Sequence, residues 1–121
     1  MARILVAEDT DAVRSFVVRA LQFHGHEVTG VGDGAQALEK LAEAEFDLLL
    51  TDIVMPVMDG IALALKVARD YPAVRILMMT GYAEAKRRAY NMESLIHDVI
   101  SKPFTADQIA DAVAKALAAE R

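Results

Sequence analysis

The sequence has no cysteine, only three prolines and no long apolar run. Because thiols are absent, disulfides, cysteine nucleophiles and zinc–thiolate sites are excluded. No apolar stretch approaches the roughly 20 residues that a membrane-spanning helix needs, and the strand pattern at the N-terminus leaves no room for a signal peptide. We therefore expect a cytoplasmic protein that makes no membrane contact.

The balance of charge excludes a further class of function. Eighteen acidic residues outnumber thirteen basic ones, and the resulting net charge of −5 disfavours direct DNA binding. The basic run Lys86-Arg87-Arg88 is interpreted as a solvated helix face. With 55% hydrophobic and 26% charged residues over 121 positions, the composition predicts one globular domain over residues 1–121, with no attached output domain.

Apolar patterns typical of strands and helices alternate five times, which predicts a doubly wound α/β domain with a parallel sheet. Helices are predicted at five places: from Thr10 or Asp11 to about His24, from Asp33, over residues 60–70, over residues 83–92, and from Thr105. Asp33 with Gln36, and Thr105 with Gln108, have the spacing of capping boxes.

The first predicted helix has an apolar stripe at helical spacing. The residues expected to face the core are Val13, Phe16, Val17, Ala20 and Leu21. Val18 lies on the opposite side of this helix, so we expect it to be an exposed apolar contact for a partner.

Four short apolar runs each end on a reactive polar residue. They lead into Glu8-Asp9, Asp52, Thr80 and Lys102. In a parallel sheet, the carboxyl ends of the strands meet at one edge, so these side chains should converge. Two carboxylates about 5 Å apart repel by roughly 3 kcal/mol at an effective dielectric of about 20, more than one lysine offsets.

A divalent cation is therefore expected at this edge. Mg²⁺ takes oxygen ligands in octahedral geometry, and the candidates are the carboxylates of Glu8, Asp9 and Asp52 with the backbone carbonyl of Val54. Aspartate is also a nucleophile toward phosphorus, so Asp52 could form an acyl phosphate. Lys102 would then pair with one phosphoryl oxygen, and the Thr80 hydroxyl would donate to another.

Taken singly, each of these residues has an ordinary structural interpretation, such as a helix cap or a loop dipeptide. Their order along the chain is far more specific. It resembles the response-regulator receiver domains of bacterial two-component signalling, often called CheY-like, over essentially the whole chain. The matching residues are Glu8-Asp9, Asp52, Met55-Pro56, Met58-Asp59-Gly60, Thr80 and Lys102-Pro103-Phe104.

This resemblance implies a flavodoxin-like fold with five helices and a five-stranded sheet in the order 2-1-3-4-5. It implies that Asp52 is the phosphoacceptor, Glu8 and Asp9 are the magnesium acids, Thr80 is the switch hydroxyl, and Lys102 is the family's lysine. The implied donor is a histidine kinase or a histidine phosphotransfer protein. The output is a downstream protein partner, and the most similar type of receiver implies an unfoldase–protease.

One position departs from the family pattern. An aromatic residue usually stands three positions before the lysine, where its ring follows the threonine, but here that position is Val99. We therefore expect the signal to pass through the segment after Thr80, where Gly81, Tyr82 and Tyr90 could change conformation.

Three other functions remain open at this stage. A flavodoxin would need phosphate-binding donors where Glu8 and Asp9 stand. A phosphohydrolase with an aspartyl nucleophile commonly has a second aspartate where Val54 stands. A binding module that works without phosphorylation would have no need of the complete set of acids, threonine and lysine.

Overall fold

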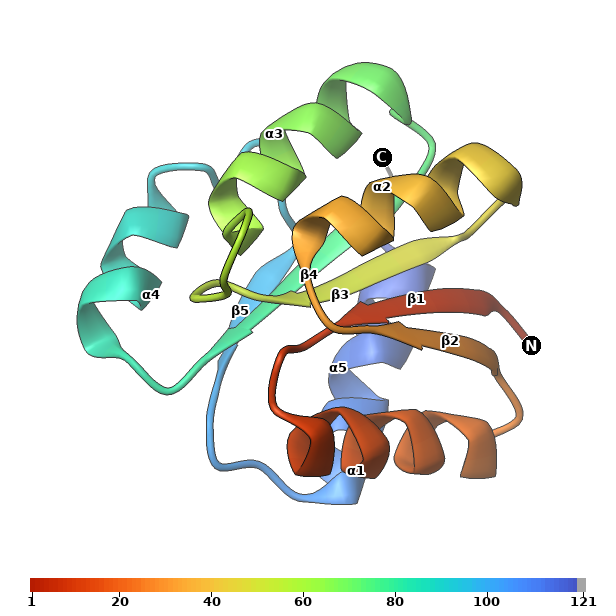
Figure 1. The fold of residues 1–121 in the computed structure, drawn as a ribbon. Coiled ribbons are helices and arrows are strands. Elements are labelled where there is room, and N and C mark those ends of the chain that lie inside the picture. The colour runs from red at the N-terminus through yellow and green to blue at the C-terminus, as the bar shows by residue number, and fades with distance from the viewer. Residues whose placement is uncertain (120–121) are drawn as a thin grey trace.

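The computed structural model describes residues 1–119. Its centre is one sheet of five parallel strands in the order β2-β1-β3-β4-β5, which confirms the predicted fold and strand order (Figure 1). The strands are β1 Arg3–Ala7, β2 Glu27–Val31, β3 Leu48–Asp52, β4 Arg75–Thr80 and β5 Asp98–Ser101.

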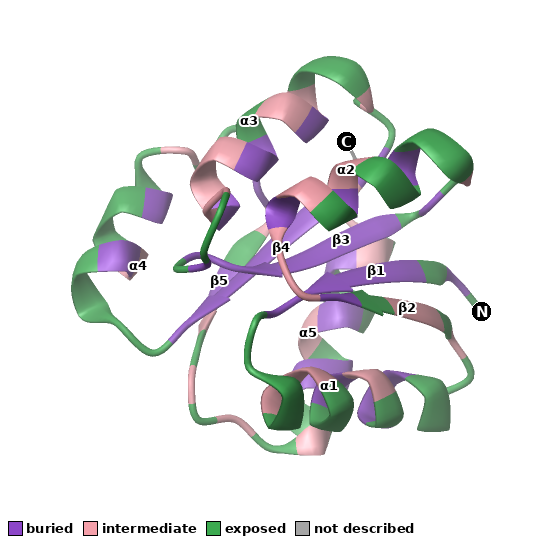
Figure 2. Ribbon diagram, viewed as in Figure 1, coloured by how far each residue is buried: buried purple, intermediate pink, exposed green. Residues whose placement is uncertain are grey.

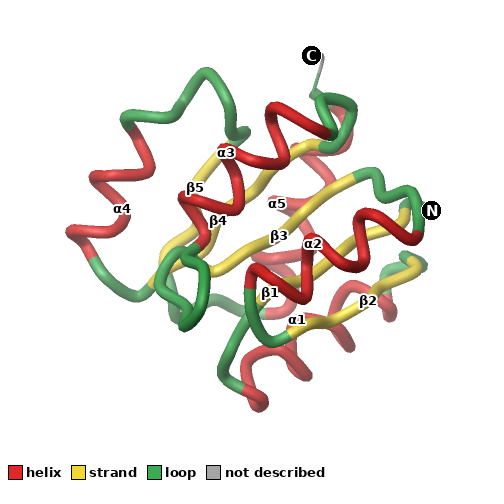
Figure 3. Tube along the Cα trace, turned by 45° about the horizontal axis from the view of Figure 1, so that its top comes forward, coloured by secondary structure: helices red, strands yellow, loops and turns green. Residues whose placement is uncertain are grey.

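Five helices cover the two faces of the sheet. They are α1 Asp11–Phe23, α2 Gly34–Glu43, α3 Gly60–Asp70, α4 Ala83–Tyr90 and α5 Ala106–Ala118. Helices α1 and α5 lie on one face, and α2, α3 and α4 lie on the other (Figures 1 and 3). Within the described residues, no helix has the length and apolar character of a membrane span.

The inner strands β1, β3 and β4 are buried over most of their length because helices cover both sides of them, and their central residues are apolar (Figure 2). Successive residues Leu48, Leu49 and Leu50 are all fully buried, and they alternate between the two cores. The parallel pairing sets Asp52 opposite Met79 and Thr80 opposite Ser101. The polar residues that end these strands are thereby brought to one edge of the sheet.

Helix starts agree with the sequence prediction in part. Thr105 and Gln108 form a complete capping box at α5. At α2, the Asp33 carboxylate accepts from the Gln36 N–H, but the Gln36 side chain accepts from Gly32 instead of from Asp33. The predicted Asp33–Gln36 capping box is therefore wrong in one of its two hydrogen bonds, because the Gln36 side chain accepts from the Gly32 N–H and not from the Asp33 N–H. Helix α4 also ends at Tyr90, two residues earlier than predicted.

Helix α1 differs from prediction in which side chains it buries. Phe16 is 42% exposed, whereas Val18 is half-buried and packs on the core. The cause is Gly30 in β2, since a Cβ at that position would lie only 3.2 Å from Val18 Cγ2. Without a side chain at position 30, Val18 fills the space over the strand, and the prediction that it is an exposed contact is wrong.

The close packing of Gly60 generates a testable prediction. Its N–H donates to the Ile53 carbonyl at 2.8 Å, and an added Cβ would lie 2.1 Å from the Asp52 carbonyl oxygen. Backbone cannot move aside as a flexible side chain can, so Gly60→Ala should lower the free energy of unfolding by about 3 kcal/mol, measured by urea unfolding. Gly32→Ala is the control, because its new Cβ would meet no atom closer than 3.6 Å. Equal stability of the two variants would contradict this packing argument.

Candidate functional site

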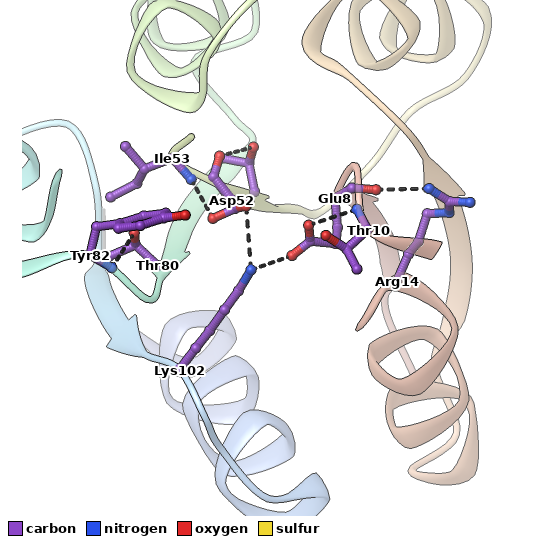
Figure 4. Close-up of polar contacts among 9 residues, drawn as sticks. Glu8, Thr10, Arg14, Asp52, Ile53, Thr80, Tyr82 and Lys102 are labelled. Atoms are coloured by element: carbon purple, nitrogen blue, oxygen red, sulfur yellow. Dashed lines mark hydrogen bonds and ion pairs between the residues drawn. The ribbon is translucent and has the colours of Figure 1, made fainter. Parts of the chain in front are cut away.

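The predicted polar residues come together at the carboxyl edge of the sheet (Figure 4). The Lys102 ammonium lies between two carboxylates, 2.5 Å from Glu8 Oε1 and 3.3 Å from Asp52 Oδ2. Glu8 is fully buried and Asp52 is nearly so. Because these residues are far apart in the sequence, their contact depends on the parallel pairing of β1, β3, β4 and β5.

Backbone groups and the Arg14 guanidinium hold Glu8 in place directly after β1. Its N–H donates to the Val31 carbonyl at 3.0 Å. Its Oε2 accepts from the Thr10 N–H at 3.1 Å, and its carbonyl accepts from Arg14 Nη1 at 2.8 Å. Both oxygens of the carboxylate are thus engaged, one by backbone and one by Lys102. The sequence analysis missed Arg14, whose only signal is its helical spacing from Asp11.

Asp52 ends β3, and its Oδ1 accepts from the Ile53 N–H at 2.9 Å. Burial raises the pKa of Asp52 from 3.8 to about 6; the Glu8 carboxylate adds to the rise, and Lys102 opposes it. Burial acts to lower the pKa of Lys102, but hydrogen bonding and charge attraction from Glu8 and Asp52 outweigh it and the pKa is raised. The lysine is therefore charged at neutral pH. Its charge only partly offsets the effects of burial and of the Glu8 carboxylate on Asp52.

The acidic residues have the arrangement of a cation site. Glu8, Asp9 and Asp52 each offer a carboxylate oxygen, and the three oxygens lie within 4.8 Å of one another. Asp9 is exposed, so the cluster opens to solvent on its side. Three hard oxygen ligands against one ammonium fit Mg²⁺, which keeps several waters and needs few protein ligands.

The loop after Asp52 carries two exposed apolar residues. Val54 is 43% exposed and Val57 is 82% exposed. Val57 has a φ of 69°, which costs about 1 to 2 kcal/mol for a β-branched residue. Val54 lies two residues after Asp52, where its side chain offers no acid or base to the site.

Thr80 ends β4 and is buried beside the loop that leads to α4. Its Oγ1 accepts from the Tyr82 N–H at 3.1 Å, and its carbonyl accepts from the Lys102 N–H at 2.8 Å. The threonine hydroxyl retains its own proton for donation. The Lys102-Pro103 peptide bond is cis.

An apolar cavity beside the stem of Lys102 was not foreseen. It has a volume of about 470 Å³ and is lined by Ala12, Val13, Phe16, Lys102, Pro103 and Phe104. The rings of Phe16 and Phe104 have their centroids 6.4 Å apart. Sequence periodicity assigned Phe16 to the core, so this surface could not be recognised before the structure.

The raised pKa of Asp52 generates a prediction about stability. Because its folded value of about 6 lies above 3.8, ionisation costs folding free energy; the cost is absent below the lower value and complete above the higher one. Asp52→Asn removes this cost. Without Mg²⁺, we expect the variant to exceed wild type in free energy of unfolding by about 1 to 2 kcal/mol at about pH 7.5, and by little at about pH 4.

Urea unfolding at both pH values measures this difference. Glu93→Gln is the matched control, because it removes an exposed carboxylate. A gain that is independent of pH, or a loss of stability at the higher pH, would contradict the assigned cause.

Comparison with known proteins agrees with this geometry. The family profile described as the response regulator receiver domain matches residues 4–114. The chain is 42% identical over 119 residues to the response regulator receiver protein CpdR of Brucella abortus (strain 2308), covering 98% of this chain and 99% of that protein. It is 36% identical over 118 residues to the sensor kinase CckA of the same strain, covering 96% of this chain but only 12% of the kinase.

Solved structures have the same fold. The response regulator TrrA from Thermotoga maritima, in complex with Mg²⁺-BeF, matches with a TM-score of 0.85 and 28% identity, covering 95% of this chain and 98% of that one. A CheY-like receiver domain protein from Methanospirillum hungatei JF-1 matches with a TM-score of 0.89 and 27% identity, covering 97% and 94%. The chain therefore belongs to the response regulator receiver domains of two-component signalling.

Proposed function

We propose that this receiver domain is a phosphorylation-dependent switch whose phosphoacceptor is Asp52. The observation that carries the proposal is the position of this buried carboxylate, which lies 3.3 Å from the Lys102 ammonium and forms one cluster with the acids Glu8 and Asp9. Among residues 1–119, the only other buried carboxylate is that of Glu8, which belongs to the same cluster. As a receiver domain it is a phosphoacceptor and not an enzyme with a separate substrate.

The proposed step is transfer from a phosphohistidine. A carboxylate oxygen of Asp52 forms a bond to phosphorus while the P–N bond breaks, and the imidazole keeps the electron pair and takes a proton from solvent. Glu8, Asp9, Asp52 and the Val54 carbonyl would hold Mg²⁺, which when bound neutralises charge on the transferring group. Lys102 would pair with one phosphoryl oxygen and Thr80 would donate to another.

The same site would assist its own dephosphorylation by water. Val54 has no group that can orient or deprotonate that water, so the acyl phosphate should persist long enough to act as a signal. This apolar side chain also disfavours the alternative of a phosphohydrolase that turns over substrate.

The proposed donor is a histidine kinase or a histidine phosphotransfer protein. Its docking surface would be the phenylalanine groove, which we define as the two adjoining cavities that share Ala12 and Phe16 and extend to Phe23 and Phe104. Phe23 is 87% exposed, which is unusual for so large an apolar side chain. One end of the groove reaches the stem of Lys102, so a protein bound there would be next to Asp52.

The proposed output is binding to a downstream protein, without direct contact to DNA. Similarity to CpdR supports this, because the receiver-like segment accounts for 99% of that protein. The sequence resemblance adds the more specific proposal that the partner is an unfoldase–protease and that the chain is an adaptor for regulated proteolysis. Kinases that start such a relay use ATP in the cytoplasm, so the proposal places the chain there.

Phosphorylation at Asp52 is tested with a small-molecule phosphodonor such as phosphoramidate. Intact-mass spectrometry should detect one added phosphoryl group with Mg²⁺ and none with excess chelator, because charge on the acids is otherwise uncompensated. Asp52→Asn should abolish the added mass, whereas Asp107→Asn, which changes an exposed carboxylate on α5, should not. Undiminished label in Asp52→Asn would reject the assignment.

Docking of the donor at the phenylalanine groove is tested separately. Phe23→Asp should slow transfer from a phosphohistidine protein by about tenfold or more, because it removes an apolar anchor, and should leave phosphorylation by phosphoramidate unchanged. Leu65→Asp is the matched control, since Leu65 is 51% exposed on α3. Equal slowing by the two variants would show that the groove has no special role.

A further inference from the structure

Helix α4 is held to the domain by little apolar packing. Its only buried residues are Ala85 and Ala89, and its N-cap residue Tyr82 makes no side-chain capping bond. Each alanine buries one methyl group, in contrast to the leucines and valines that anchor α1 and α3. Polar contacts therefore have a large share in fixing the position of α4.

Lys86 makes a side-chain hydrogen bond that joins α4 to β5. Its Nζ donates to Ser101 Oγ at 2.7 Å. The same ammonium lies 5.9 Å from the centre of the Tyr90 ring, one turn further along α4. Because Ser101 is exposed, this hydrogen bond can exchange with water when the two elements separate.

Both polar attachments of α4 lead to the phosphorylation site. Ser101 is the register partner of Thr80 and immediately precedes Lys102. The N-cap of α4 is attached to Thr80 as well, through the Tyr82 N–H on the threonine hydroxyl at 3.1 Å. If Thr80 and Lys102 turn toward a phosphoryl group on Asp52, the two hydroxyl oxygens that accept hydrogen bonds from α4 and its N-cap, Thr80 Oγ1 and Ser101 Oγ, are displaced together.

The aromatic ring that usually follows the movement of the threonine in this family is missing here. Its position is occupied by Val99, which is small, apolar and 95% buried within the core. We propose that Lys86 takes this part: it is a latch that holds α4 on β5 in the unphosphorylated protein and is released on phosphorylation. The release rests on the proposed function of Asp52, whereas the latch in the unphosphorylated state does not. Release would free α4, with Tyr90 and the basic Arg87 and Arg88, for contact with a partner.

The latch is tested first without phosphorylation, by amide hydrogen exchange of residues 83–90 in the full chain. Lys86→Met keeps the aliphatic stem and removes the ammonium, and Ser101→Ala removes the acceptor. Each should speed exchange in α4 by about five- to tenfold, and the double variant should exchange no faster than either single one. Arg87→Met is the control: Arg87 is exposed and pairs at 3.9 Å with Glu84 on the same helix, so its loss should leave exchange unchanged. Equal exchange in Lys86→Met and wild type would overturn the latch.

The second measurement compares each protein before and after treatment with phosphoramidate and Mg²⁺, with the added mass verified at Asp52. Phosphorylation should speed α4 exchange in wild type and Arg87→Met but add little in Lys86→Met, whose latch is already open. An undiminished response in phosphorylated Lys86→Met would overturn the release. A protein that acquires no phosphoryl mass would instead contradict the proposed function, while the first measurement would still decide the latch.

Discussion

The Lys102 ammonium between two buried carboxylates is the contact on which the rest of the site depends. Three acids gathered at one edge, of which Glu8 and Asp52 are buried, leave a net negative charge beside the single lysine. That excess of negative charge makes the folded protein less stable, but it also favours binding of a divalent cation. In the proposed function, Lys102 would then pair with a phosphoryl oxygen. Burial raises the pKa of Asp52 and the nearby Glu8 carboxylate adds to the rise, while the excess of acids over lysine accounts for the proposed need for Mg²⁺.

Sequence reasoning recovered the α/β class because apolar patterns typical of strands and helices alternate along the chain, and the strand order came from the resemblance to receiver domains. Apolar runs such as 48–51 can be strands in only a few architectures, and their polar terminal residues identified the edge where Glu8, Asp52 and Lys102 meet. The Thr105 cap was predictable because its partners are three residues apart. These are local patterns, and the parallel sheet converts them into a site without further information.

Other features depend on contacts between distant segments, and the sequence could not supply them. Whether Phe16 or Val18 faces the core is decided by Gly30 on another element. The latch between Lys86 and Ser101 spans 15 residues and follows no helical or strand period. The absence of a ring at position 99 indicated that signalling must differ from the family pattern, but only the structure identified a polar contact that could take its place.

The edge strand β2 has a consequence for how this protein can evolve. Beside Gly30 lie Cδ and Cγ of Arg14, 3.3 Å from where a Cβ would be, and the guanidinium of Arg14 holds the carbonyl of Glu8. A side chain at position 30 would press on Arg14 and Val18, which would have to shift by a few tenths of an ångström, and Arg14 is the residue that holds the backbone of Glu8. A change at this edge-strand glycine is thereby tied to the acidic site through α1, and a compensating change at Arg14 or Val18 would make it easier to accommodate.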